Sequence, residues 1–427
     1  MAAHTLKKAR IPFRLFEASS RPGGRLYSLV ASDGTTLEMG ADSFESHHRL
    51  VFELLKEFQI EWSETVYDPT GIPLWRSTQG ESLTDIEYQK IASHLIQKMI
   101  RDRVQAFGSA EQYKINSPVL AQELDSLSME QYLRVNWIQP DDRVVQFWDS
   151  WARTHYSSRP ERVSSLRWIW DQSGERKTRG IYKIKGGWES LNKVLFERVA
   201  GVIPDHLVRL KWALDGIRKT EDGFRCAFKT PGGTEVLETQ NIILAMPINQ
   251  YRKINGISDL PLPKEKIQAL KTLGLGEGAK AFVSYKSGAI ETMERSYLRN
   301  QVQMTYLKSQ NMDWVGGLRG GAQSHWTLPD IENWRTDLLA NSPVSKEGQF
   351  DYHVINWKDR PFIQGARSQW GPGQWGSYAV TFENGDFDET LQWAGEYVPS
   401  SEKGTVHAAL VSGQAAALKM IERLKES

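Results

Sequence analysis

With 427 residues, of which 40% are hydrophobic, the chain is long enough to bury a large core, and we expect two domains or two interleaved lobes. The formal net charge of +1 gives no reason to expect a nucleic acid or an anionic membrane as partner. A single cysteine, Cys226, excludes an internal disulfide and any cysteine-rich metal site, and no apolar run approaches the roughly 20 residues that span a bilayer.

The first 18 residues predict the end of a helix followed by a strand. Residues 2–10 combine a small apolar face with cations at the C-terminal end, and Pro12 is expected to stop the helix. Residues 13–17, "FRLFE", alternate as a strand does, and Glu17 stands at the tip, where a dinucleotide-binding unit places the acidic residue that binds ribose hydroxyls. That residue usually follows a G-x-G-x-x-G turn by about 20 residues. We therefore expect the first strand and its glycine loop to precede Met1.

The turn that follows, "SSRPGGR", has its own chemistry. Gly23 and Gly24 permit positive φ angles and close backbone approach. Arg21 and Arg25 flank them with guanidinium groups suited to phosphate oxygens. A surface turn with solvated arginines is the alternative interpretation.

These residues resemble the flavin-containing amine oxidases, which include monoamine, polyamine and L-amino-acid oxidases. The family motif E-A-x-x-R-x-G-G-R is matched in order by Glu17, Ala18, Arg21, Gly23, Gly24 and Arg25. The resemblance also implies that a second group of residues lies where the family backbone contacts the flavin side of FAD, namely Gly40, Ala41, Asp42 and Ser43.

The last 40 residues resemble the closing signature of the same family, a strand into A-G-E and then G-T-V-H at the start of a helix. The matching residues are Gly395, Glu396, Gly404, Thr405, Val406 and His407. The N-terminal amides of that helix are suited to flavin or pyrophosphate oxygens. Thr405 stands where monoamine oxidases have a tyrosine, and Ala408 stands where the family often has glycine. A glycine-rich corner without a ligand is the alternative.

The middle of the chain follows the family order. Residues 184–199 resemble the helix that opens the second half of the FAD domain, and residues 206–247 predict a β-meander that ends in a buried parallel strand stopped by Pro247. The resemblance implies that the backbone near Leu214 contacts the adenine.

The expected fold is α/β, with a Rossmann-like FAD/NAD(P)-binding domain that lacks its first strand and glycine loop and is interleaved with an α+β substrate domain. We assign residues 1–60, 181–250 and 385–427 to the first domain and residues 61–180 and 251–384 to the second. Helical patterns occur in the second domain at residues 93–108, 129–138 and 143–154.

The resemblance implies FAD as cofactor, with an amine or amino acid giving a hydride equivalent to the flavin and dioxygen reoxidising it to yield hydrogen peroxide. This chemistry needs no metal and no protein nucleophile. Lys280, in the alternating segment "AKAFVSYK", matches the family lysine that holds a water near flavin N5. The alternative is a strand lysine facing solvent, which we expect for Lys286.

The segment from Trp357 to Tyr378 resembles a family segment near the substrate. Trp357 and Asp359 match it, whereas Gly365-Ala366-Arg367 departs from G-S-Y. The aromatic residues Trp357, Trp370, Trp375 and Tyr378 are candidate walls of the substrate site, with ordinary core packing as the alternative. Cys226 lies in the meander, so we expect FAD to be bound non-covalently. The pair His47-His48 opens a helical pattern and is expected at the surface or as a cap rather than as a ligand.

Three accounts of the missing loop remain open: a start codon internal to an ordinary FAD oxidase, a chain with weak FAD binding, or a non-catalytic relative. As it stands we expect the sequence to bind FAD weakly, and an upstream extension to restore binding. A carotenoid-desaturase-like or protoporphyrinogen-oxidase-like enzyme is the alternative within FAD proteins. The expected location is cytoplasmic, or exported if an upstream signal has been lost, and the oligomeric state is open.

Overall fold

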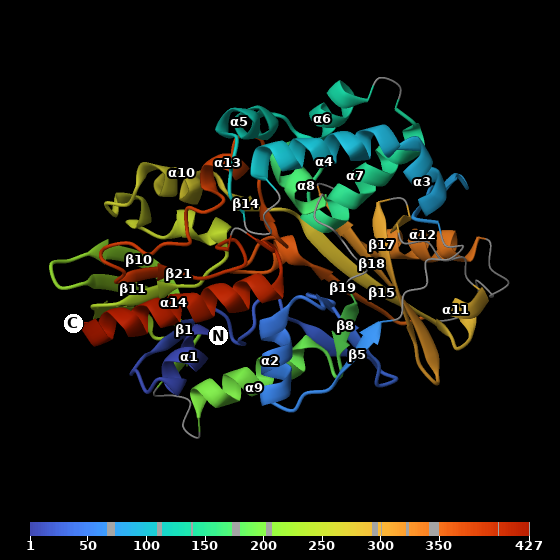
Figure 1. Ribbon diagram of the computed structural model, residues 1–427. Coiled ribbons are helices and arrows are strands. Elements are labelled where there is room, and N and C mark those ends of the chain that lie inside the picture. Colours follow the sequence, from blue (N-terminus) through green and yellow to red (C-terminus); the bar gives the residue numbers. More distant parts are fainter. Residues whose placement is uncertain are drawn as a thin grey trace.

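The structure is a computed structural model that describes residues 1–65, 73–108, 113–137, 140–172, 180–201, 207–292, 298–299, 301–321, 324–340, 350–399 and 401–426. Figure 1 shows a large sheet with helices α4 (Ser93–Phe107), α7 (Asp142–Tyr156) and α8 (Ser165–Gln172) on one side and, next to it, a group of short strands and helices that contains both chain ends. Among these residues, no helix is both long enough and apolar enough to cross a bilayer.

The N-terminal strip forms the predicted helix and strand. Helix α1 (Ala2–Lys8) is followed by β1 (Leu15–Glu17), which pairs in parallel with β9 (Val208–Leu210). The helix ends before Pro12, because Arg10 adopts a left-handed φ of 59°. Pro12 follows the C-cap residue Ala9 by three positions, as expected for a residue that cannot continue the helix.

The short strands come from segments far apart in the chain. Strands β2 (Ser28–Val30) and β3 (Thr36–Glu38) form a hairpin, β13 (Ile242–Leu244) pairs in parallel with β21 (Leu391–Trp393), and β8 (Ile181–Ile184) lies between β4 (Phe44–Glu45) and β5 (Trp62–Thr65). The predicted meander is confirmed as β10 (Ala213–Lys219), β11 (Phe224–Thr230) and β12 (Gly233–Thr239). The helices of this group are α2 (Arg49–Glu57), α9 (Trp188–Ala200) and α14 (Val406–Glu426), and α14 packs against α1, α2 and β21 (Figure 1).

Among the described residues, the large sheet has seven strands in the order β19-β15-β18-β17-β16-β6-β7. Their bounds are β6 (Trp75–Arg76), β7 (Ser82–Leu83), β15 (Gly278–Lys286), β16 (Leu298–Arg299), β17 (Val302–Lys308), β18 (Met312–Gly320) and β19 (Tyr352–Asn356). Strand β15 is antiparallel to both neighbours, and Lys280 lies opposite Leu318 of β18 and Ile355 of β19. A separate pair is formed by β14 (Gly274–Leu275) and β20 (Ser368–Gln369).

The other elements in the described part of the chain are helices and short 3-10 turns. Their bounds are α3 (Asp85–Ile91), α4 (Ser93–Phe107), α5 (Pro118–Ser126), α6 (Met129–Asn136), α7 (Asp142–Tyr156), α8 (Ser165–Gln172), α10 (Lys264–Thr272), α11 (Ala289–Thr292), α12 (Leu328–Leu339) and α13 (Trp375–Tyr378), with 3-10 turns at Pro160–Arg162, Ile248–Lys253, Ile257–Asp259 and Trp357–Asp359. The predicted helical patterns correspond to α4, α6 and α7. Three of the described helix starts, at Thr84, Ser128 and Thr327, carry capping boxes.

Candidate functional site

The turn after β1 is closed by the side chain of Arg21 and needs glycine for its backbone path. Gly23 has a φ of 100°, and a Cβ there would lie 2.5 Å from the side chain of Asn192; a Cβ on Gly40 would lie 1.9 Å from the carbonyl oxygen of Arg25. Both positions therefore need glycine. Arg21 donates to the carbonyl oxygens of Pro22, Gly24 and Leu26. The guanidinium group of Arg21, which the sequence suggested as a ligand for phosphate oxygens, therefore closes the turn.

The tip of β1 lies against the start of the meander. Glu17 accepts a hydrogen bond from the amide of Ser19 at 2.7 Å, and its carbonyl oxygen accepts one from the amide of Trp212 at 2.9 Å. Ala18 follows at the tip, and Leu214 is half-buried on β10 two residues beyond Trp212. The structure therefore brings together the predicted ribose and adenine segments, which are almost 200 residues apart in sequence.

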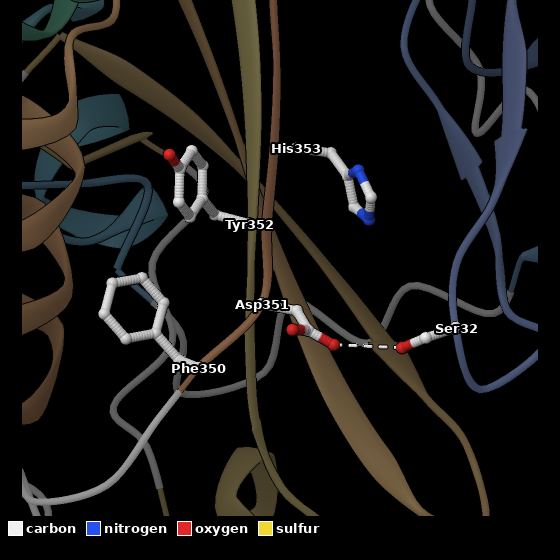
Figure 2. Close-up of a pocket in the computed structure, with 5 residues that line it drawn as sticks. All are labelled: Ser32, Phe350, Asp351, Tyr352 and His353. Atoms are coloured by element: carbon white, nitrogen blue, oxygen red, sulfur yellow. Dashed lines mark hydrogen bonds between the residues drawn. The ribbon is translucent and has the colours of Figure 1, made fainter.

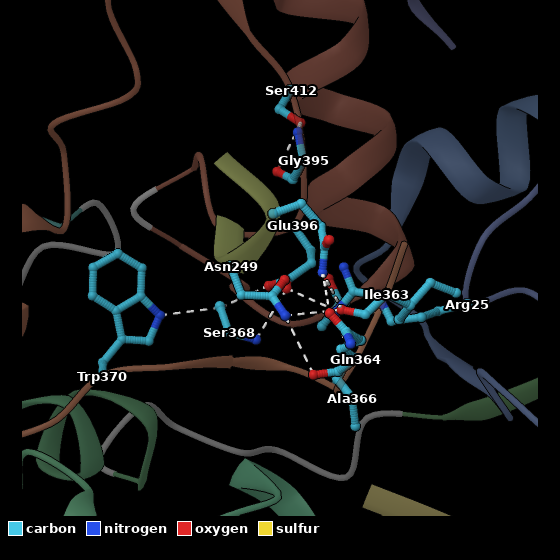
Figure 3. Close-up of polar contacts among 12 residues, drawn as sticks. Arg25, Asn249, Ile363, Gln364, Ala366, Ser368, Trp370, Gly395, Glu396 and Ser412 are labelled. Atoms are coloured by element: carbon cyan, nitrogen blue, oxygen red, sulfur yellow. Dashed lines mark hydrogen bonds and ion pairs between the residues drawn. The ribbon is translucent and has the colours of Figure 1, made fainter. Parts of the chain in front are cut away.

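The N-terminal turn and the C-terminal signature meet at a buried carboxylate (Figure 3). Arg25 Nη1 lies 2.9 Å from Glu396 Oε1 and also donates to the carbonyl oxygen of Ala366. Ser368 donates to Glu396 from its amide at 3.0 Å and from its hydroxyl at 2.7 Å. Burial acts to raise the pKa of Glu396, but Arg25 and Ser368 together hold that pKa below its ordinary value. Gly395, next to it, is bonded to Ser412 of α14.

The start of α14 lies beside Glu396. The amide of Gly404 donates to the carbonyl oxygen of Glu396 at 3.1 Å, and the hydroxyl of Thr405 accepts from the amide of Ala408 at 3.0 Å. Val406 is the first helical residue, so its amide is among those that have no partner within a helix. A Cβ on Gly404 would lie 3.5 Å from the side chain of Arg367.

Lys280 is buried in a cluster of charges. Its side chain is 5% exposed, and its Nζ lies 3.8 Å from Oδ2 of Asp42. Lys183 Nζ lies 3.3 Å from Oδ1 of the same carboxylate. Burial lowers the pKa of Lys280, whereas Asp42 and then Glu38 act to raise it. The solvent-facing alternative is wrong for Lys280 and is confirmed for Lys286, the exposed end of β15.

The remaining residues of the flavin-side group lie around Asp42. Gly40 and Ala41 are partly buried beside the turn, and Ser43 is exposed. Glu38, two residues before Gly40, accepts from the amide of Trp188 and the hydroxyl of Ser28, and burial raises the pKa of Glu38 to about 7.

The four candidate aromatic residues do not line one common surface. Trp357 is buried and donates to the carbonyl oxygen of Met39 at 3.1 Å. Trp370 and Trp375 pack edge to face in the largest core cluster, and Tyr378 packs against that cluster. Lys403 lies over both indole rings and, through burial, has a pKa far below its ordinary value. The alternative of core packing therefore describes Trp370 and Trp375.

The expectation for the histidine pair needs correction, because His48 is buried rather than at the surface. It is the N-cap residue of α2 but makes no side-chain cap, and it is 4% exposed. His47 Nε2 lies 2.8 Å and His48 Nε2 lies 3.4 Å from the two oxygens of Glu402, and the ring of His407 stacks on that of His48. The amide of Glu45 donates to Nδ1 of His48, so Nε2 carries the proton and donates to Glu402. That tautomer favours a hydrogen-bonded cluster over a metal site.

A pocket of 290 Å³ lies at the edge strand β19, lined by Ser32, Phe350, Asp351, Tyr352 and His353. Figure 2 shows His353 and Tyr352 projecting to opposite sides of that strand, and Asp351 bonded to Ser32. None of the residues predicted from sequence lines this pocket.

Sequence reasoning missed several residues of these clusters: Glu38, Lys183, Thr305, Ser368 and Glu402. Glu38 lies two residues before Gly40, the first residue of the predicted flavin-side group, and that closeness in sequence was the available signal. The others are assembled by contacts between distant segments, which leave no local pattern in the sequence.

Comparison with known proteins identifies a family. A family model described as flavin-containing amine oxidoreductase matches residues 1–315 and 329–421. The fold is similar to that of cyclohexylamine oxidase from Brevibacterium oxydans IH-35A (18% identity, TM-score 0.82) and of wild-type putrescine oxidase bound to putrescine (18% identity, TM-score 0.79). Each likeness covers 99% of this chain and 96% of the other. No curated protein sequence matches the chain.

Proposed function

Because this chain belongs to the flavin-containing amine oxidoreductase family, we propose that it oxidises a primary or secondary amine or an amino acid and passes the electrons to dioxygen, giving hydrogen peroxide. Membership makes the chain an FAD-dependent oxidoreductase with a Rossmann-like FAD-binding domain and a substrate domain. The substrate class and the acceptor are the proposal. Two structural neighbours are named as amine oxidases, and one of them is bound to putrescine, which supports an amine.

The donor and acceptor groups of the described residues fit FAD. Glu17 offers a carboxylate at the tip of β1, where ribose hydroxyls are bound in dinucleotide-binding units. The first amides of α14 offer hydrogen-bond donors together with the positive end of a 21-residue helix. A Cβ on Gly40 would collide with the carbonyl oxygen of Arg25, so the loop after β3 packs directly on the turn that follows β1.

Non-covalent binding of FAD is part of the proposal. Cys226 is a buried residue of β11, and burial raises the pKa of its thiol to about 11. A protonated, buried thiol is a poor nucleophile for attachment to a flavin.

The observation that carries the proposal is the burial of Lys280 beside Asp42. FAD supplies the acceptor for the hydride equivalent, which no protein group provides. Lys280 Nζ has donors that can hold a water molecule, and its ammonium form places positive charge where negative charge develops on dioxygen. The surrounding residues exclude bulk water, which strengthens that charge effect.

Because weak FAD binding is expected, the experiment uses protein saturated with added FAD, with Lys280→Met and, as the matched control on the same strand, Lys286→Met. Anaerobic mixing with a panel of amines and amino acids, followed by oxygen, separates flavin reduction from reoxidation. We expect bleaching by at least one amine, peroxide on reoxidation, and reoxidation slowed by about tenfold or more in Lys280→Met only, the size of one removed electrostatic group. A yellow protein that no amine or amino acid bleaches would refute the proposal and would favour the desaturase-type alternative.

A further inference from the structure

We propose that Asp42 is a positioning residue for Lys280: its carboxylate, on the loop after β3, holds the lysine side chain in place and keeps it in the charged form. This inference rests on the proposed function, because it concerns the residue to which that function assigns the charge at the redox site. It adds a side-chain role to a position for which the sequence suggested only backbone contact.

The geometry places Lys280 on the face of β15 that turns toward the N-terminal segments. Side chains on a strand alternate, so positions 278, 280 and 282 share one face. A Cβ on Gly278 would lie 2.6 Å from Ala366, and Phe282 belongs to the core cluster that contains Met39 and Trp357. That face therefore packs against the segments that carry Arg25, Asp42 and Ala366 rather than against solvent.

Asp42 is fixed from three sides. Lys280 and Lys183 lie at 3.8 Å and 3.3 Å from its two oxygens, and the hydroxyl of Thr305, on β17, donates to Oδ2 at 3.4 Å. Those groups come from β15, β8 and β17, so the carboxylate ties strands of the large sheet to the loop after β3. The pKa of Asp42 is lowered: burial would raise it, but Lys280 and Lys183 outweigh that effect. Asp42 is therefore an anion at neutral pH.

The other charged groups around Lys280 do not replace Asp42. Glu38 is the second carboxylate, and burial raises its pKa to about 7, so it is partly protonated at neutral pH. Lys183 and Arg367 are cations that act to lower the pKa of Lys280. Without Asp42, a buried ammonium would face two cations and one half-ionised acid, and the neutral amine would be favoured.

The test measures the protonation of Lys280 directly, by competitive labelling of the FAD-loaded protein with acetic anhydride across a pH series and mass spectrometry of the peptide containing residue 280. The pH of half-maximal labelling does not depend on how accessible the amine is. In Asp42→Asn we expect this midpoint to fall, so that Lys280 is acetylated about tenfold faster at a pH below the wild-type midpoint. Asp42→Glu, which retains the charge, should stay near wild type.

Lys183→Gln is the matched variant for which we expect the labelling midpoint to shift in the opposite direction. It removes a cation that repels Lys280, so the midpoint should rise, whereas simple loosening of the cluster would move both variants toward the value of a solvated lysine. In addition, the pH at which flavin reoxidation declines should move down in Asp42→Asn. An unchanged or raised midpoint in Asp42→Asn, or shifts of both variants in one direction, would overturn the inference. Labelling requires no enzyme turnover. A protein that oxidises no amine would therefore refute the proposed function, and the labelling midpoints would still test the role of Asp42.

Discussion

The buried pair of Arg25 and Glu396 gives a stability prediction whose size follows from the structure. Arg25→Met removes the cation that contacts Glu396, and this carboxylate, 6% exposed, keeps its two hydrogen bonds from Ser368 and the weaker charge effect of Arg167. Breaking a buried pair from one side costs about 3 kcal/mol. Unfolding entropy of about 2.1 cal/mol/K per residue gives about 0.9 kcal/mol/K for the 427-residue chain. We therefore expect the melting temperature of Arg25→Met to fall by about 3 °C at pH 7.

The pH dependence of this loss has a definite sign. In the wild type the folded-state pKa of Glu396 is below its ordinary value of 4.5, so the stabilisation is present above pH 4.5 and is lost as the pH falls through the folded-state pKa. In Arg25→Met, burial dominates and the pKa of Glu396 rises, so that variant gains stability on acidification. The difference in melting temperature should therefore be largest at pH 7 and smaller at pH 4.5.

The assay is thermal unfolding followed by tryptophan fluorescence for the wild type, Arg25→Met and the double variant Arg25→Met/Glu396→Gln. The double variant has no unpaired buried charge, so it should be more stable than Arg25→Met at pH 7. Equal losses at pH 7 and pH 4.5, or a double variant less stable than the single one, would show that the charge of Glu396 is not the cause.

Three further outcomes are expected. Gly40→Ala should lower the melting temperature by about 3 °C or more, because the new methyl collides with the carbonyl oxygen of Arg25, whereas Gly232→Ala, which meets nothing closer than 3.7 Å, should be neutral. His407 has a pKa of about 4, lowered by burial and by His48, against 6.5 when solvated. The wild type should therefore lose stability as the pH falls from 6.5 to 4, and the melting temperature of His407→Gln should depend less on pH over this range. The wild type should gain stability relative to Lys403→Met as the pH rises from neutrality toward 10.5. The folded-state pKa of Lys403 is lowered, so over this range the proton is bound in the unfolded chain and is released as the pH rises. A difference in melting temperature between the two proteins that stays constant with pH would contradict this.

The sequence by itself determined the features that depend on local pattern. Alternation predicted β1 and the meander, apolar periodicity predicted α4, α6 and α7, and the turn "RPGGR" indicated that glycine was needed, as the φ of 100° at Gly23 confirms. Each of these follows from the backbone preferences of a few consecutive residues. The family motif at both ends followed from the order of such short segments.

The tertiary structure alone decided where the charges lie. Arg21 and Arg25 carry the same guanidinium group in the same turn, yet one bonds to its own loop and the other to Glu396, 371 residues away. Lys280 and Lys286 occupy the same face of β15 by strand alternation, yet Lys280 is buried against Asp42 and Lys286 is exposed. Local pattern fixes which face a side chain takes, but the partner and the solvent exposure on that face depend on distant segments that pack there, and electrostatic energies are set by those distances and by burial.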